Sequence, residues 1–402
     1  MDDPAAQDPA LRRLVDQVND ARGRRAALDI RGAGTKPFGS RRAGDEPLDL
    51  QPLAGISSHE PSELVVTVRA GTPLLELEAA LAEHGQCLPF EPPRFDAPAG
   101  PGASDTTGSP AEDDPPEPHG DAGDRAAGGT VGGMVAAGLS GPARPAVGSV
   151  RDHLLGATML NGRGEVLRFG GQVMKNVAGY DVARVLAGSM GVLGVILEVS
   201  LKVLPRPPAQ TTLAFDVGQE QALALLTAWR RQPLPVHASS WHEGQLRLRL
   251  AGARAAVLAA AGRLCSAHGG RALDANEATA WWQAVRDQRL AFFRPTAADA
   301  AAGQSLWRLS VPPTAPVLGT PGPVFIEWGG AQRWLRTAAP AAQVQALAAA
   351  VGGHASCIRP APGSAAALAG PLPEVLMRLH RSLKQAFDPD RIFNPGRLYP
   401  DL

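Results

Sequence analysis

Residues Gly128–Gly138 have the sequence GGTVGGMVAAG, in which paired glycines surround a single threonine. Threonine is a good helix N-cap, so we predict that Thr130 starts a helix whose first turn is almost bare of side chains. Glycine destabilises a helix interior, which makes packing alone a poor explanation of the doubled pairs. Amides at a helix start bind anions, so the stretch predicts a pyrophosphate site; the alternative is a small-residue helix packed tightly on a sheet.

A second glycine-rich turn lies nearer the N-terminus. Ala27–Ile30 is predicted to be a short strand, and Arg31–Lys36 (RGAGTK) follow it directly. A dinucleotide fingerprint opens a helix, whereas Pro37 follows this turn and the next glycine, Gly39, is misplaced. The turn is therefore interpreted as a loop whose amides approach a phosphate closely, with two cations adding charge; an ordinary glycine turn is the alternative.

The residues after the first stretch predict an antiparallel sheet and a third glycine-rich loop. Leu154–Leu160 and Glu165–Phe169 flank Asn161–Gly164, a strong hairpin signal. Glycines recur through Gly170–Gly194, where they would permit a flat ligand to approach the backbone. Gly194–Leu204 then alternates apolar and polar residues, which predicts a strand with one buried face.

Further elements are expected on both sides of this core. Leu64–Arg69 is predicted to be a strand, and Thr72 is predicted to cap the helix after it. After Pro205–Pro208, a predicted domain boundary, strands and helices follow one another to about Pro340, which indicates a mixed α+β domain. A last helix has one apolar stripe, formed by Leu372, Leu376, Leu379, Leu383 and Phe387.

Composition excludes several classes of function. The chain has 402 residues, 39 Lys and Arg against 39 Asp and Glu, and a formal net charge of +0. This balance argues against nucleic acid or an anionic membrane as the partner. No apolar run is long enough to span a membrane and the start is polar, so we predict a cytoplasmic protein, peripheral to a membrane only through partners.

No functional site is predicted within residues 96–127 or at the candidate metal ligands. The segment 96–127 is rich in Pro, Gly, Asp and Ala, and it is predicted to be a disordered surface insertion. His237 and His242 are an odd number of residues apart and are interpreted as surface or packing residues, so no metal site is predicted. The three cysteines lie far apart, so another chain must supply any iron–sulfur cluster.

Four segments together carry a specific resemblance: TVGGMVAAGLSGP, GSVRDHLLGATML, FGGQVMKNVAGYDVARVLAGSMGVLGVILEVSLKVLPRP and FNPGR. They resemble the FAD-binding domain of the vanillyl-alcohol-oxidase/PCMH flavoprotein family, over most of the chain outside the insertion. The resemblance implies an α+β protein with a two-subdomain PCMH-type FAD-binding fold at residues 1–207. It also implies a ferredoxin-like α+β cap domain at 208–340 and a C-terminal helical segment at 341–402 that returns to the flavin domain.

The resemblance also implies which residues bind the cofactor. Those at the FAD pyrophosphate would be Arg31, Gly32, Ala33, Gly34, Thr35, Lys36, Thr130, Val131, Gly132, Gly133, Met134 and Val135. Those along the flavin and adenine would be Gly138, Arg151, Asp152, Gly188, Ser189, Gly191, Gly194, Val195, Ile196, Asn394 and Gly396. Trp282 and Arg286 match the family's Trp-x-x-x-Arg, in which the arginine meets a substrate carboxylate; helix packing is the alternative for this pair.

The implied function is that of a FAD-binding subunit in a heteromeric oxidoreductase. Such an enzyme would oxidise a small 2-hydroxy acid, glycolate to glyoxylate, and pass electrons through flavin toward an iron–sulfur subunit. The first glycine loop has no histidine, so FAD is expected to be non-covalent. The Gly-Glu-His-Gly run of the catalytic relatives is absent, so we predict little activity alone and a sister flavoprotein subunit as a further partner. A self-sufficient FAD-dependent D-2-hydroxy-acid dehydrogenase and a non-catalytic scaffold remain alternatives.

Overall fold

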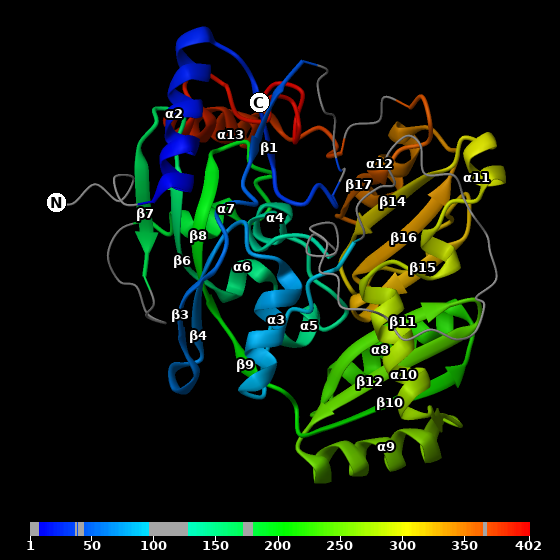
Figure 1. The fold of residues 1–402 in the computed structure, drawn as a ribbon. Helices are drawn as coiled ribbons and strands as arrows, with labels where there is room; N and C mark the ends of the chain where they lie inside the picture. Colours follow the sequence, from blue (N-terminus) through cyan, green and yellow to red (C-terminus); the bar gives the residue numbers. More distant parts are fainter. Residues whose placement is uncertain (1–7, 37, 39–43, 96–127, 172–179, 365–367) are drawn as a thin grey trace, which may run out of the picture.

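The computed structural model describes residues 8–36, 38, 44–95, 128–171, 180–364 and 368–402. The insertion predicted at 96–127 lies outside the described residues, as do residues 172–179 of the third glycine-rich loop. The described chain forms two large sheets that lie side by side (Figure 1). The chain passes from the first to the second where β9 (Leu204–Pro205) leads into β10 (Ala209–Asp216).

The first sheet is antiparallel, with five strands in the order β3-β4-β8-β6-β7. The strands are β3 (Ile56–Glu60), β4 (Val65–Arg69), β6 (Leu154–Leu160), β7 (Val166–Gly170) and β8 (Val195–Lys202). The hairpin predicted around Asn161–Gly164 is confirmed, because β6 and β7 pair directly across it.

Helices cover both faces of this sheet, and the first body of the molecule is the sheet with these helices. One face carries α3 (Leu74–Glu83), α4 (Val131–Ala137), α6 (Val150–His153) and α7 (Val182–Leu186). The short helix α5 (Arg144–Val147) follows α4 and packs against the second sheet. The other face carries α2 (Pro9–Arg24) and a parallel pair, β1 (Leu28–Arg31) with β2 (Glu46–Asp49). A short strand, β5 (Gln86–Cys87), pairs with β9.

The structure corrects the predicted cap of α3. Thr72 is fully buried, and its hydroxyl donates toward the carbonyls of Gly55 and Arg69 at 3.1 and 2.8 Å instead of accepting from the helix. The helix itself begins at Leu74 without a side-chain cap. The wrong prediction arose because a hydroxyl caps a helix by accepting from its amides, and here the Thr72 hydroxyl accepts instead from the amide of Gly55, at 2.9 Å.

The structure also corrects the predicted single buried face of β8. Opposite β6, Leu197 is an extra residue between two successive pairs, which is a β-bulge. The bulge reverses the alternation of side chains, because one added residue moves all later ones to the other face. Val199 and Leu201 therefore pack with α3 and α4, whereas Val195 and Leu197 pack with α2. The strand is buried on both faces.

The second sheet has eight antiparallel strands in the order β13-β10-β12-β11-β15-β16-β14-β17. After β10 these are β11 (Val236–His242), β12 (Gln245–Gly252), β13 (Arg271–Ala272), β14 (Ser305–Ser310), β15 (Val324–Glu327), β16 (Gln332–Thr337) and β17 (His354–Arg359). Its outer face is covered by α8 (Gln219–Arg230), α9 (Arg254–His268) and α12 (Ala341–Ala349). The remaining helices are α10 (Ala275–Arg286), on the inner face, and α11 (Ala297–Ala301).

The inner face of this sheet meets the first body. A cluster of buried apolar residues there contains Leu306, Phe325 and Trp334 from the sheet, and Leu139 and Met190 of the first body pack against it. The second sheet extends past residue 340, the predicted end of the cap domain, because β17 pairs with β14. These two sheets and their helices form a mixed α+β architecture, which is the predicted fold class.

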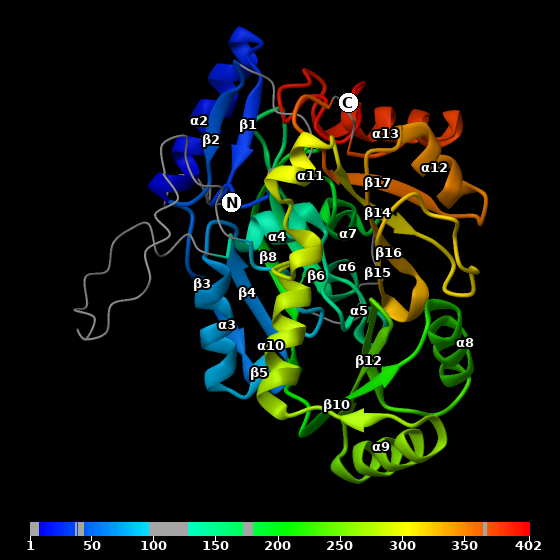
Figure 2. The same cartoon turned by 90° about the vertical axis from the view of Figure 1, so that its right-hand side faces the viewer.

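The last helix, α13 (Glu374–Phe387), returns to the first body (Figures 1 and 2). Lys384 is fully buried there, and its Nζ donates to Asp388 Oδ2 at 2.7 Å and to the carbonyls of Val192 and Phe393 at 2.7 and 2.8 Å. The buried ammonium has three acceptors for its three donors, so the return of the chain is held by a fully satisfied polar contact.

Three of the five residues predicted to form the apolar stripe on this last helix face solvent, whereas Phe387 packs against the core of the first body. Leu376, Leu379 and Leu383 are 43%, 55% and 37% exposed, and Val375 is 58% exposed. An apolar stripe normally packs on a core, but here the buried side of the helix is the one that carries Lys384. Among the described helices, none is long and apolar enough to cross a membrane.

Candidate functional site

A pocket in the first body brings together segments that are far apart in the sequence. The residues that line it are Ile30, Arg31, Gly32, Ala33, Gly34, Thr35, Lys36, Leu50, Thr130, Gly132, Gly133, Ala136, Ala137, Met190, Gly191, Gly194, Ile196, Asn394 and Arg397. They come from the turn after β1, from α4, from the loop before β8 and from the C-terminal segment. All three glycine-rich segments named by the sequence therefore contribute, and they meet at one place.

The turn after β1 supplies hydrogen-bond donors to this pocket. In the described part of the chain, no protein acceptor is bonded to the amides of residues 32–36. Lys36 is only 9% exposed, and its Nζ makes one long hydrogen bond, 3.4 Å, to Thr35 Oγ1. Burial lowers the pKa of the Lys36 ammonium to about 8. Successive free amides beside a buried amine form an anion site of the kind that holds phosphate groups.

The amides at the start of α4, in contrast, are not free. The structure thus corrects the interpretation of these amides as unoccupied donors. Thr130 caps the helix as predicted, because its hydroxyl accepts from the amide of Gly133 at 3.3 Å. The amides of Val131 and Gly132 donate to the carbonyls of Thr72 and Ala70 at 3.0 and 2.8 Å. These bonds fasten α4 to the end of β4. The first three amides of the helix are thus already bonded, and the free donors belong to the other turn.

The glycines around Thr130 have different roles. A Cβ on Gly132 would lie 2.7 Å from the Cβ of Ala70 and 3.0 Å from its carbonyl, so this glycine permits helix–sheet contact. A Cβ on Gly129 would lie 2.7 Å from Lys36 Nζ. Gly133, in contrast, has only Thr130 Oγ1, at 3.3 Å, near its missing side chain. Gly133 leaves pocket space open, whereas Gly132 is required by packing.

The C-terminal segment closes one side of the pocket. The Asn394 side chain accepts from the amide of Ile30 at 2.8 Å and donates to the carbonyl of Met190 at 2.7 Å. Arg397 donates to Asp29 Oδ1 at 2.8 Å, and the other oxygen of that carboxylate accepts from Arg31 at 2.7 Å. The return of the C-terminus to the glycine loops, expected from the resemblance, is therefore present, and Arg397 is a pocket residue that the sequence interpretation missed.

Several predicted cofactor contacts do not line this pocket. Val131, Met134 and Val135 are buried in the core between α4 and the sheet, and Val195 lies in the core under α2. The others outside the lining are Gly138, Arg151, Asp152, Gly188, Ser189 and Gly396. Asp152 accepts from Ser149 and belongs to a capping box of α6. Val131, Met134, Val135 and Val195 are neighbours in sequence of pocket residues, but their helix or strand directs their side chains into the core.

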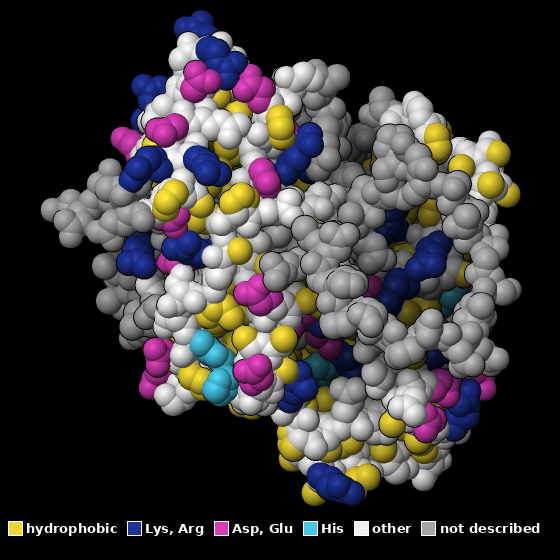
Figure 3. Space-filling view, in the orientation of Figure 1, with side chains coloured by type: hydrophobic (Ala, Val, Ile, Leu, Met, Phe, Trp, Pro, Cys, Tyr) yellow, Lys and Arg dark blue, Asp and Glu magenta, His cyan; other side chains and the backbone are white. Residues whose placement is uncertain are grey.

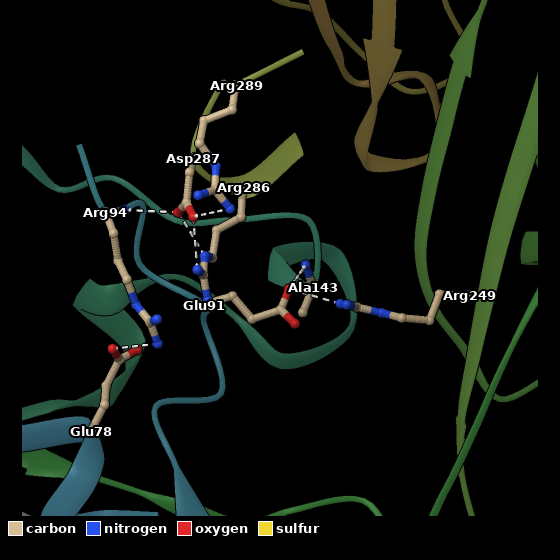
Figure 4. A network of polar contacts seen from close by, with 8 residues as sticks. All are labelled: Glu78, Glu91, Arg94, Ala143, Arg249, Arg286, Asp287 and Arg289. Atoms are coloured by element: carbon tan, nitrogen blue, oxygen red, sulfur yellow. Dashed lines mark hydrogen bonds and ion pairs between the residues drawn. The ribbon is translucent and has the colours of Figure 1, made fainter. Parts of the chain in front are cut away.

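Arg286 lies in a network of charged residues and not in the pocket (Figure 4). Its Nε and one terminal nitrogen donate to the two oxygens of Asp287, at 2.7 and 2.8 Å. Asp287 also accepts from the amide of Arg94 at 3.0 Å, and Arg94 pairs with Glu78 at 2.5 Å. The guanidinium of Arg286 therefore has a bidentate carboxylate partner within this network.

The remaining polar clusters give no sign of a metal centre. Among the described residues, no group of three or more His, Cys, Asp or Glu side chains could hold a metal ion. His237 lies at the bulge of β11, and His242 packs against Phe292 and Phe325. Packing is the role the structure gives to His242.

Two family models match the chain, one at each end of the site. The first is described as FAD binding domain and covers residues 12–105, which include the turn with the free amides. The second is described as FAD linked oxidases, C-terminal domain, and covers residues 364–398, which include α13 and Asn394. The fold and the site thus define a FAD-linked oxidoreductase.

Similarity to curated proteins identifies the family within this class of oxidoreductases. Glycolate oxidase subunit GlcE of Escherichia coli (strain K12) is 40% identical over 389 residues, which cover 97% of each chain. The chain belongs to the glycolate oxidase subunit GlcE family. Glycolate oxidase subunit GlcD of Bacillus subtilis (strain 168) is 36% identical over 84 residues, 21% of this chain and 18% of that protein.

The architecture also matches solved structures. An alkyldihydroxyacetonephosphate synthase superposes with a TM-score of 0.61 at 14% identity, covering 95% of this chain and 74% of that one. At this identity the match shows the fold alone. It confirms the mixed α+β fold that the sequence predicts.

Proposed function

We propose that this chain is the FAD-binding subunit of a heteromeric glycolate oxidase. The observation that carries the proposal is the pocket whose free amides at residues 32–36 and buried Lys36 fall inside the FAD binding domain match. A pyrophosphate needs donors and positive charge, and this turn offers both. The turn and Lys36 would hold the pyrophosphate, and Met190 and Asn394 would lie further along the cofactor. FAD would supply the hydride acceptor for oxidation of a carbon that bears a hydroxyl.

We further propose that FAD binds non-covalently and that the second sheet is its cap. Among the described residues that line the pocket, none is a histidine, a cysteine or a tyrosine that could form a bond to the flavin. Met190 lines the pocket and packs against the buried apolar cluster that includes Trp334 and Leu306 on the inner face of the second sheet. That sheet therefore lies beside the part of the pocket that Met190 lines.

Lys36 gives this proposal a pH dependence. Its pKa is lowered to about 8 by burial, whereas a bound pyrophosphate would favour the charged amine and raise that pKa. Below pH 8 the amine is already protonated, so FAD affinity is expected to be constant. Above pH 8 binding must take up a proton, and affinity should fall by up to about tenfold per pH unit. Fluorescence titrations of FAD between about pH 7 and 9.5 measure this, and the Lys36→Met variant should show a flat profile. An equally steep profile in that variant would remove Lys36 from the site.

Two features support partner subunits, which we propose to be a sister flavoprotein and an iron–sulfur protein. The three cysteines are free and separate: Cys87 lies on β5, Cys265 on α9 and Cys357 on β17, so they cannot ligate one cluster. The α13 stripe, formed by Val375, Leu376, Leu379 and Leu383, exposes four large apolar side chains on one helix, and clustered exposed apolar residues mark interaction sites. We assign this stripe to a contact with a partner subunit.

Co-expression tests the assembly. The chain alone should give little or no glycolate-dependent dye reduction, and activity should appear with both partner subunits. Leu379→Glu should leave a folded, yellow chain that no longer copurifies with the partners, because it places a charge in the stripe. Leu258→Glu is the matched control, since Leu258 is 61% exposed on α9, and it should assemble normally. Robust turnover by the isolated chain would instead select the self-sufficient dehydrogenase.

A further inference from the structure

The inner face of the second sheet carries an arginine for which the proposed function has no use so far. On β14, Leu306 belongs to the cluster that packs on Met190, whereas Trp307 and Leu309 pack on the opposite side with α12. Side chains alternate along a strand, so Arg308 shares the inner face with Leu306. Its direct neighbour on β16 is Trp334, which belongs to the same cluster. Arg308 therefore lies on the sheet face that carries this cluster, against which the pocket residue Met190 packs.

Arg308 is unusual because it has no partner. In the part of the chain that the structure describes, it forms no hydrogen bond or ion pair, and its enclosed Nε has no acceptor. Other inner-face arginines are engaged: Arg249 pairs with Glu91 at 2.7 Å, and Arg247 stacks at 3.5 Å over Trp281. A partly buried guanidinium without an acceptor costs free energy that a bound anion would recover.

The surroundings of Arg308 are positive and rich in donors. Ser356 lies directly opposite Arg308 on β17, and His354 precedes Ser356 by two residues on the same strand. Arg144, on α5, is close enough to lower the pKa of Arg308, which burial and this repulsion bring to about 10. Burial and Arg308 in turn lower the pKa of His354. Arg308 stays charged at neutral pH, and it lies on the face of the second sheet that meets the first body.

The surface shows the same distribution of charge. Figure 3 shows Lys and Arg side chains gathered in the hollow between the first body and the second sheet. Arg144 is held beside this region, because its guanidinium stacks at 4.5 Å over Trp328, whose indole donates to the carbonyl of Gly141 at 3.0 Å. Arg144 and Arg308 thus approach each other, and among the described residues no carboxylate is bonded to Arg308.

We propose that Arg308 and Ser356 bind the carboxylate of a small 2-hydroxy acid. The proposal rests on the proposed function, because it places the acid where the FAD pocket meets the cap sheet. A guanidinium forms two parallel hydrogen bonds to a carboxylate, and the neighbouring hydroxyl donates a third. Arg308 takes the role that the sequence gave to Arg286, whose own guanidinium is paired with Asp287.

Equilibrium binding to the FAD-loaded chain tests this site. Oxalate has no hydrogen on its carbon atoms and so cannot be oxidised in the same way, which makes it a stable probe beside glycolate. Calorimetry and the flavin absorption spectrum should both report saturable binding of each acid. Arg308→Gln should weaken binding about 10- to 100-fold, as expected for the loss of charge-assisted hydrogen bonds. Arg308→Lys should be intermediate, because it keeps the charge but loses the two-pronged geometry.

The controls separate this inference from the proposed function. Arg247→Gln removes a partly buried arginine from the same sheet face and should leave the affinity for oxalate unchanged. Folding of each variant is checked by circular dichroism. A colourless chain that cannot be loaded with FAD would overturn the proposed function. A yellow, folded chain that binds neither acid, or whose Arg308→Gln variant binds them as well as the parent does, would overturn this inference alone. Inorganic phosphate binding as tightly as oxalate would also overturn it, because the site would then not select a carboxylate.

Discussion

Replacement of Gly133 by valine is expected to abolish FAD retention while the chain stays folded. Gly133 lines the pocket, and its missing side chain has only Thr130 Oγ1 near it, at 3.3 Å. A branched side chain at this position would fill space that we assign to the cofactor and would meet no core residue. Acid precipitation of the parent chain should release about one flavin per chain into the supernatant, since we propose no covalent bond. The variant should release less than a tenth of that amount.

The Gly132→Val variant is the informative comparison, because the structure changes the result that the sequence alone would predict for it. Both glycines follow Thr130, and Gly132→Val looks like the natural way to block an anion site. The structure places its added Cβ 2.7 Å from that of Ala70 on the strand side, so this variant should lose thermal stability together with flavin. Gly133→Ala serves as the second control and should retain most of its flavin. Full flavin occupancy in Gly133→Val would show that the cofactor lies elsewhere.

Replacement of Lys384 by methionine is expected to lower the free energy of unfolding by about 3–5 kcal/mol, the usual cost of breaking a buried ion pair by removing one partner. Its Nζ contacts Asp388 Oδ2 at 2.7 Å and two carbonyls, and both charged side chains are almost completely buried. Without the ammonium, the Asp388 carboxylate and the two carbonyls lose their donor in a site that water does not reach. Urea unfolding followed by circular dichroism measures the change.

A matched variant on the same helix sets the scale. Arg381 pairs with Asp401 at 2.8 Å, but its side chain is 42% exposed, so Arg381→Met should cost less than about 1 kcal/mol. The Lys384 variant should also lose flavin before it unfolds, because the carbonyl of Phe393 that Lys384 holds is adjacent to Asn394, which contacts the pocket. An unfolding curve that overlays the parent curve would show that the buried pair contributes no net stability.

Local sequence patterns were sufficient where an element is decided by its own residues. The hairpin around Asn161–Gly164 was predictable because a short glycine-containing loop between two mainly apolar runs favours one chain reversal. The same reasoning failed at β8, since a single bulge residue, Leu197, leaves no mark in the alternation of apolar and polar letters.

The sequence by itself therefore determined the family, the glycine-rich segments of the FAD-binding domain and the return of the C-terminus. Tertiary structure alone decided which donors in those segments are free. The amides of Val131 and Gly132 are consumed by carbonyls of Thr72 and Ala70, whereas the turn before Lys36 keeps its amides. It also left the guanidinium of Arg308 without a bonded acceptor among the described residues. A hydrogen bond depends on distances between atoms that lie far apart in the chain, and spacing along the sequence does not contain those distances.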